Sequence, residues 1–126
     1  MTDLHKALYN FWASFGLPVW HQDTVPEEAV LPYITFQTVS GEAMSATILT
    51  ATAWFRDEDQ GVNAQRAAVL DQIAQAVPHA GRMLPVGDKG YLMLYRNSGT
   101  FQSYVQDEED KKVVGGRTSL EVHFYH

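Results

Sequence analysis

Hydrophobic and polar positions follow two different periods along the chain, and these predict two helices and a set of strands. Between Met1 and Phe15 the apolar residues recur every three or four positions, as on one helix face: Leu4, Ala7, Leu8, Phe11 and Phe15. Gly16 and Pro18 should end this helix, because glycine favours a left-handed cap and proline cannot continue a helix. A second helix is predicted from about Asn63 to Val77, ending before Pro78. Its apolar stripe comprises Ala67, Leu70, Ile73, Ala74 and Val77.

Alternating stretches rich in aromatic and β-branched residues predict the strands. Tyr33–Val39 and Ala46–Phe55 flank a turn at Gly41-Glu42 and are expected to pair as an antiparallel hairpin. Shorter extended segments are predicted at Val19–Gln22, Met83–Val86, Tyr91–Arg96, Phe101–Gln106 and, after Gly115-Gly116, Thr118–Tyr125. The chain shows no internal repeat or linker. Residues 1–126 are therefore expected to form one α+β domain, with two helices packed on a mostly antiparallel sheet.

The overall composition is that of a folded globular protein, with 45% hydrophobic and 19% charged residues. No apolar run approaches the ~20 residues that a membrane span requires. The amphipathic start of the chain does not resemble a secretion signal, so we expect the protein to be made and kept in the cytoplasm. Because cysteine is absent, disulfides, thiolate nucleophiles and cysteine metal sites are excluded.

Charge is distributed unevenly between the two halves of the chain. Residues 1–63 hold 2 basic and 8 acidic side chains, whereas residues 64–126 hold 7 of each, which together give the net charge of −6. Tight nucleic-acid binding needs a surplus of Lys and Arg to neutralise phosphates. Specific binding of nucleic acid is therefore not expected.

The motifs of common enzymes are missing from this sequence. It contains no Gly-rich phosphate loop and no Gly-x-Ser-x-Gly nucleophile elbow. The five histidines are not spaced as a helical ligand pair, and a zinc site needs three or four converging ligands. We therefore predict no catalytic residue, no cofactor and no metal site.

Six consecutive charged residues form a distinct segment near the C-terminus: Asp107, Glu108, Glu109, Asp110, Lys111 and Lys112. The segment lacks the alternating acidic order of a calcium-binding loop. Because unpaired charges are costly to bury, it should be an exposed, mobile loop. These six residues are the candidates for an assembly contact, and a solvated turn without any role is the alternative.

One segment resembles a known family. Residues 25–34, from Val25-Pro26-Glu27 to Pro32-Tyr33-Ile34, are similar to the signature of tail-terminator and tail-completion proteins of long-tailed phages. The strand ending Trp54-Phe55-Arg56, the helix from Asn63 to Val77 and the final strand through Glu121–Tyr125 also resemble that family.

The resemblance implies a non-enzymatic structural subunit without cofactor or metal. Such subunits assemble as a homo-oligomeric ring, commonly a hexamer, on the end of the tail tube, where they stop tube growth and face the head connector. DNA passes through the ring, and the protein moves from the host cytoplasm to the virion tail. A ring needs a heterologous interface, and the acidic first half and charge-balanced second half are suited to guide such pairing.

Other functions remain open at this point. Within the structural class, the chain could be a minor capsid or head–tail connector protein. From a different class, it could be a small-ligand or peptide-binding α+β module whose pocket is lined by Trp12, Trp20 or Trp54. A hydrolase is a third possibility, although the sequence offers no discernible nucleophile or acid–base pair.

Overall fold

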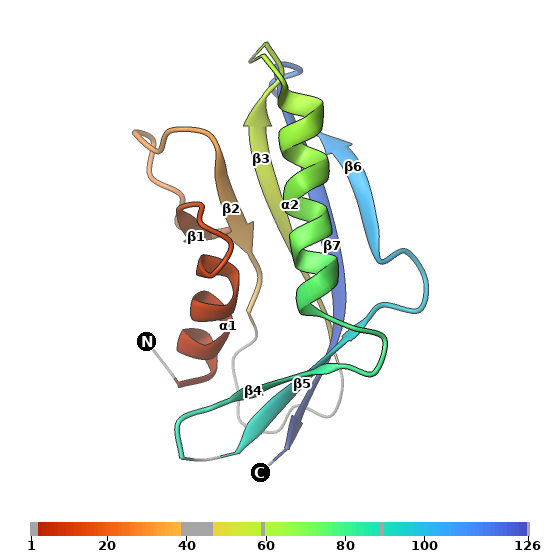
Figure 1. The fold of residues 1–126 in the computed structure, drawn as a ribbon. Coiled ribbons are helices and arrows are strands. Elements are labelled where there is room, and N and C mark those ends of the chain that lie inside the picture. Colours follow the sequence, from red (N-terminus) through yellow and green to blue (C-terminus); the bar gives the residue numbers. More distant parts are fainter. Residues whose placement is uncertain (1–2, 39–46, 59, 89, 126) are drawn as a thin grey trace.

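The computed structural model describes residues 3–38, 47–58, 60–88 and 90–125. The elements are α1 (Asp3–Ala13), β1 (Val19–His21), β2 (Tyr33–Phe36), β3 (Thr47–Arg56), α2 (Val62–Ala76), β4 (Arg82–Pro85), β5 (Tyr91–Arg96), β6 (Gln102–Gln106) and β7 (Val113–Tyr125). Both helices lie on one face of the sheet (Figure 1). No helix in the described part of the chain is long and apolar enough to cross a membrane.

The sheet has seven strands in the order β1-β2-β3-β7-β5-β4, and β6 also pairs with β7. Among the described strands, only β1 and β2 are parallel neighbours, so the predicted α+β fold with a mostly antiparallel sheet is confirmed. The predicted hairpin is confirmed as well, with Tyr33 opposite Trp54 and Phe36 opposite Ala51. The turn predicted at Gly41-Glu42 lies outside the described residues, as do Val39 and Ala46.

The core lies between the two helices and the sheet face that they cover. Along β3, Leu49, Ala51, Ala53 and Phe55 are buried toward this side. The alternate residues of β3 point to the opposite face, which no helix covers (Figure 1). Helix α1 buries Leu4, Leu8 and Phe11 as predicted, and it also buries Trp12, which is 2% exposed. Trp12 is therefore a core residue and cannot line an open pocket.

The boundary predicted for the last strand is wrong. β7 begins at Val113, and Gly115-Gly116 lie inside it, paired with Trp54 and Ala53 of β3. A Cβ atom on Gly116 would lie 2.9 Å from Leu70 Cγ. The two glycines therefore let neighbouring groups approach the strand closely, and they do not form a turn.

Candidate functional site

The sheet face opposite the helices carries a polar pocket of about 280 Å³. Its floor consists of side chains from three adjacent strands, namely Tyr33, Thr35, Thr50, Thr52, Trp54 and Arg117. Its rim consists of Gln22 and Val25 from the loop after β1, and of Asp107 and Val113 from the β6–β7 hairpin. Segments from four parts of the chain thus meet around one cavity.

Strand register places the floor residues beside one another. Tyr33 lies opposite Trp54, and Thr52 lies opposite both Thr35 of β2 and Arg117 of β7. Residues directly opposite on antiparallel strands share a face, so these side chains form one contiguous surface.

Two threonine hydroxyls hold the large side chains of the floor in place. The indole Nε1 of Trp54 donates a hydrogen bond of 3.0 Å to Thr35 Oγ1. The guanidinium Nε of Arg117 donates a bond of 3.2 Å to Thr52 Oγ1, and Thr52 is only 4% exposed. The guanidinium also carries two Nη groups, which can donate hydrogen bonds to an acceptor in the pocket.

The rim and the floor are electrostatically linked through Tyr33. Burial raises the pKa of the Tyr33 phenol above its usual value of 10.0, and the negative charge of Asp107 raises this pKa further. Both effects disfavour the phenolate. At neutral pH Tyr33 therefore presents a neutral hydroxyl, which can donate or accept a hydrogen bond.

The charged segment from Asp107 to Lys112 forms the tip of the β6–β7 hairpin, and its backbone is bonded internally. Asp107 Oδ1 accepts the backbone N–H groups of Glu109 at 2.8 Å and Asp110 at 3.4 Å. Asp110 Oδ1 accepts the N–H of Lys112 at 3.0 Å. The N–H of Asp57, after β3, donates to the carbonyl of Lys112 at 2.6 Å. These bonds restrain the backbone of the tip, and its predicted mobility stays a prediction.

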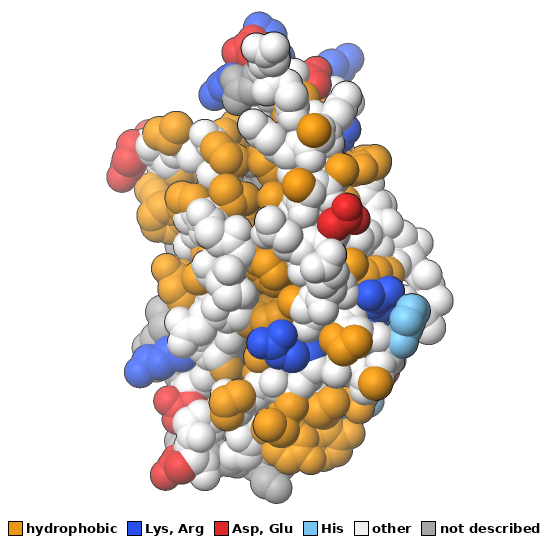
Figure 2. Space-filling view, in the orientation of Figure 1, with side chains coloured by type: hydrophobic (Ala, Val, Ile, Leu, Met, Phe, Trp, Pro, Cys, Tyr) orange, Lys and Arg blue, Asp and Glu red, His pale blue; other side chains and the backbone are white. Residues whose placement is uncertain are grey.

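The six candidate residues are therefore divided between two environments. Glu108, Glu109, Asp110, Lys111 and Lys112 are exposed, as the sequence predicts. Asp107 is half-buried and lies on the pocket rim. Together with Arg56, Asp57 and Glu58, the exposed members make one end of the molecule highly charged, with both signs present (Figure 2).

Of the three tryptophans named as possible pocket residues, only Trp54 lines this pocket. Sequence reasoning missed Arg117 and the threonines of the floor. These residues come together because β2, β3 and β7 are neighbours in the sheet. The alternation of residues within a single strand does not reveal which strands lie beside it. Among the described residues, no group of three or more His, Cys, Asp or Glu side chains is arranged to hold a metal ion.

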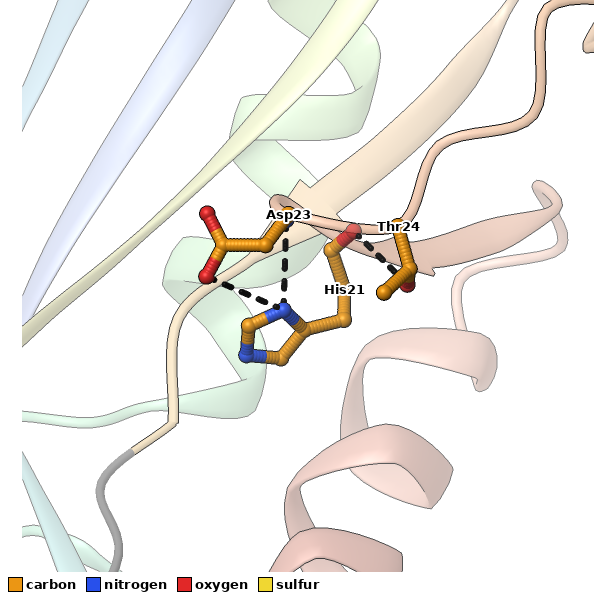
Figure 3. Close-up of polar contacts among 3 residues, drawn as sticks. All are labelled: His21, Asp23 and Thr24. Atoms are coloured by element: carbon orange, nitrogen blue, oxygen red, sulfur yellow. Dashed lines mark hydrogen bonds and ion pairs between the residues drawn. The ribbon is translucent and has the colours of Figure 1, made fainter.

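The start of the loop that leads to the pocket is fixed by His21. Its Nδ1 accepts the backbone N–H of Asp23 at 3.2 Å and lies 3.7 Å from the Asp23 carboxylate, while Thr24 Oγ1 donates to the His21 carbonyl at 3.3 Å (Figure 3). The His21 ring also stacks on His5 with centroids 5.7 Å apart. These bonds order the chain on both sides of Gln22, which reaches the rim.

Comparisons with known proteins inform the fold alone. No protein-family model matches this chain, and no curated protein sequence matches it significantly. The fold is similar to one solved structure at a TM-score of 0.54 and 16% sequence identity, covering 98% of this chain and 92% of that chain. That protein carries no functional name. The likeness extends over the whole chain, so the α+β domain found here recurs in another protein.

Proposed function

We propose that this chain is a structural subunit of a phage or prophage particle that caps the tail tube as a ring and faces the head. It acts through surfaces, without catalysis, cofactor or metal. The resemblance of residues 25–34 to the tail-terminator signature motivates this function, and the α+β domain is compatible with it. The partners in this proposal are further copies of the chain, the tube protein and the head–tail connector.

One observation carries the proposal further than the resemblance. The Pro32-Tyr33 end of the signature and the charged hairpin tip are separated by more than seventy residues, yet both reach the same pocket. Tyr33 and Asp107 both line it, and the negative charge of Asp107 raises the pKa of the Tyr33 phenol. The Leu31–Pro32 peptide bond is cis, and it leads directly into β2 and Tyr33. Two features that the sequence singles out separately therefore belong to one surface.

The charged end of the molecule is the surface that we assign to assembly contacts. Exposed charges of both signs guide association and register more than they add affinity. The tip is attached to the end of β3 by the hydrogen bond from the Asp57 N–H to the Lys112 carbonyl, which fixes its position on the sheet. In a ring around DNA, the acidic members would also keep phosphates from adhering to the lumen.

The function can be tested in the particle itself. Removing the protein from the assembling particle should give tail tubes of irregular length that fail to join heads, and the purified parent chain should restore termination. Electron microscopy of tube ends reads both outcomes. Tubes of normal length that join heads in the absence of the chain would refute the proposal. Rings at a head vertex without any on tubes would instead identify a minor capsid or connector protein.

The role of the tip can be tested separately. Replacing Glu108, Glu109, Lys111 and Lys112 with serine leaves Asp107 and Asp110, which bond the tip backbone, in place. This variant should melt like the parent but fail to terminate tubes. A matched control replaces the exposed Lys6 and Asp88 with serine, which also leaves the net charge unchanged, and should terminate normally. A tip variant as active as the control would limit the tip to a structural turn.

A second candidate function is favoured by the pocket. The alternative of a small-ligand or peptide-binding module places Trp12, Trp20 or Trp54 in its pocket, and Trp54 lines a pocket that Arg117 also lines. A carboxylate ligand would suit the Nη donors of the Arg117 guanidinium. Titration of small carboxylates and short peptides, followed by the indole N–H resonance of Trp54, tests this function. Saturable shifts that Arg117→Met abolishes would support it, and unchanged resonances throughout would exclude it.

A further inference from the structure

One edge of strand β6 faces no other strand in the part of the chain that the structure describes. Among the described residues β6 pairs only with β7, along which β5 continues the same edge (Figure 1). Hydrogen bonds join Asp107 N–H to the Val113 carbonyl and Ser119 N–H to the Phe101 carbonyl. Bonded pairs alternate along an antiparallel ladder, so Ser103 and Val105 also face β7. The N–H and C=O groups of Gln102, Tyr104 and Gln106 therefore point outward.

The two end strands of the sheet are much poorer templates for a further strand. β1 is only three residues long, and the His21 carbonyl is already bonded to Thr24. In β4 the bond between Val86 N–H and the Gly90 carbonyl fixes the alternation, so Met83 and Pro85 face outward. Proline offers no N–H, and short or proline-containing edges are protected from pairing. β6 contains no proline and no charged residue.

A groove of about 250 Å³ runs between β6 and helix α2, lined by Ala67, Leu70 and Asp71 of the helix and Gln102, Ser103 and Tyr104 of the strand. Gln102 spans its base, because its Nε2 donates to the Leu70 carbonyl at 2.8 Å. The Tyr104 side chain is 60% exposed, and the Arg66 guanidinium lies over its ring at 4.3 Å. A large, mostly exposed aromatic ring therefore lies beside the strand edge and is available to a partner there.

We propose that the partner for this edge is β6 of a second copy of the chain. The two strands pair antiparallel, and a twofold axis passes between the two Tyr104 residues. The strand reads Gln102-Ser103-Tyr104-Val105-Gln106, so reversing it exchanges Gln for Gln and returns Tyr to itself. In this register Tyr104 faces Tyr104 of the partner, and Gln102 faces the partner's Gln106. All three pairs present outward groups, which gives about six backbone hydrogen bonds. An isologous contact of this kind closes at two copies.

The space beside the paired strands suits the exposed ring. Helix α2 packs on β7, so the four strands β7, β6, β6 and β7 would lie between and beneath the two α2 helices. Three strand spacings of about 4.8 Å put the helices at least ~14 Å apart. Packed helices lie about 8–10 Å apart, so a gap would remain between them. The two Tyr104 rings lie on the helix side of the sheet and would fill this gap. The uncharged strand avoids direct repulsion between two acidic chains at the contact.

This dimer is a state of the free protein and does not depend on the ring. Its contact is small, so the pairing should be weak and reversible in the micromolar to millimolar range. Amide hydrogen exchange can detect it residue by residue. The amides of Gln102, Tyr104 and Gln106 should gain protection as concentration rises, whereas those of Ser103 and Val105 should be protected at every concentration. Equal behaviour of the two sets would overturn the proposal.

Matched proline variants test the contact by sedimentation equilibrium. Tyr104→Pro removes an outward N–H that β7 does not use, so the chain should fold and remain at its monomer mass of 14.2 kDa. Met83→Pro makes the same change on the outer edge of β4, at a residue that is 56% exposed, and should dimerise like the parent. Dimerisation by both variants, or by neither, would contradict the assignment to β6.

A cysteine variant covers the case in which Tyr104→Pro does not fold. The chain has no cysteine, so Tyr104→Cys introduces a single thiol. Facing residues in a bonded antiparallel pair have Cα atoms about 5.5 Å apart, which is within disulfide range. Mild oxidation should therefore give a covalent dimer from Tyr104→Cys and much less from Met83→Cys. A monomer after oxidation, or protection of the three amides only when a different protein is added, would refute pairing between copies.

Discussion

Leu70 of helix α2 lies directly over the bare backbone of Gly116 in β7. A Cβ on Gly116 would meet Leu70 Cγ at 2.9 Å and both of its Cδ atoms at 3.0 Å. Leu70 is buried, and its carbonyl also accepts a hydrogen bond from the side-chain amide of Gln102 in β6, which joins the helix to the strand beside β7. The absence of a side chain at Gly116 thus sets how closely α2 approaches the centre of the sheet.

Gly116→Ala should therefore destabilise the fold. The added methyl group must displace α2 or force Leu70 from its rotamer, and overpacking of this kind costs about 1–3 kcal/mol. Urea unfolding followed by circular dichroism measures the effect as a lower midpoint with an unchanged slope. Gly99→Ala is the matched control, because the nearest atom to its added Cβ is Asn97 Nδ2 at 4.0 Å. If Gly116→Ala and Gly99→Ala lower the urea midpoint equally, the close approach of Leu70 to Gly116 does not limit stability.

Gly115 and Gly116 show which parts of the fold a single sequence predicts and which it does not. Helix α2 and strand β5 were predicted to within a residue because their patterns are local: a stripe through Leu70 and Ile73, and an alternation through Leu92 and Leu94. A pair of glycines indicates a turn by the same local logic. Here the cause is non-local, since Leu70 belongs to another element, and one sequence does not reveal that neighbour.

The candidate site was predictable to a smaller extent. The charge run and the tryptophan at position 54 stand out in the sequence, and both reach the pocket. Arg117 did not stand out, because its role depends on its position opposite Thr52, which lies 65 residues earlier in the chain on the neighbouring strand. The parallel pairing of β1 with β2 was missed for the same reason.

Arg96 should contribute to stability through the end of helix α2. Its Nε donates to the Val77 carbonyl and its Nη2 to the Ala74 carbonyl, both at 2.8 Å. The last carbonyls of a helix lack partners within the helix, and a cation is favourable there. We expect Arg96→Met to lower the free energy of unfolding by about 1.5–3 kcal/mol, as for hydrogen bonds to charged groups.

A matched arginine serves as the control for that experiment. Arg82 donates to the Ala76 carbonyl at 3.2 Å from an exposed position. Arg82→Met should therefore change stability by no more than about 0.5 kcal/mol, the usual range for surface substitutions. Denaturant melts of the two variants decide the matter, and a larger loss from Arg82→Met would reverse the assignment.

Acid should destabilise the protein through His5. Burial lowers the pKa of His5 below the usual 6.5, and the neighbouring charge of His21 lowers it further. The unfolded chain then takes up this proton more readily than the folded chain does. The contribution of neutral His5 to the free energy of unfolding is therefore fully present above about pH 6.5, and it is lost as the pH falls through and below that value.

The contribution of His5 can be isolated with uncharged replacements. In His5→Gln and His5→Phe the proton is absent from both states, so the melting temperature should fall less between pH 7.5 and pH 5 than in the parent. His5→Phe also retains a ring against Phe36, whose centroid lies 5.5 Å from that of the His5 ring. It should therefore be the more stable of the two variants at pH 7.5. A parent-like pH dependence in both variants would assign the effect to other groups.

The pocket geometry can be tested through the ionisation of Tyr33. Asp107 raises the Tyr33 pKa by its charge, in addition to the larger effect of burial. Asp107→Asn keeps an oxygen that can accept the tip N–H groups but removes the charge. It should lower the Tyr33 pKa while leaving it above 10.0, since burial remains. Ultraviolet titration of the phenolate reads this value, after subtraction of a Tyr33→Phe titration that accounts for the other tyrosines.

Glu108→Gln provides the control, because it removes the same charge from the adjacent residue. Glu108 is exposed and is not among the pocket residues, so its carboxylate should be screened by solvent and leave Tyr33 unchanged. A shift confined to Asp107→Asn supports a rim in which one specific carboxylate of the tip faces the signature tyrosine. Equal shifts from both variants would mean that Tyr33 senses only the general charge of the tip. The proximity on which the proposed assembly surface rests would then lose its support.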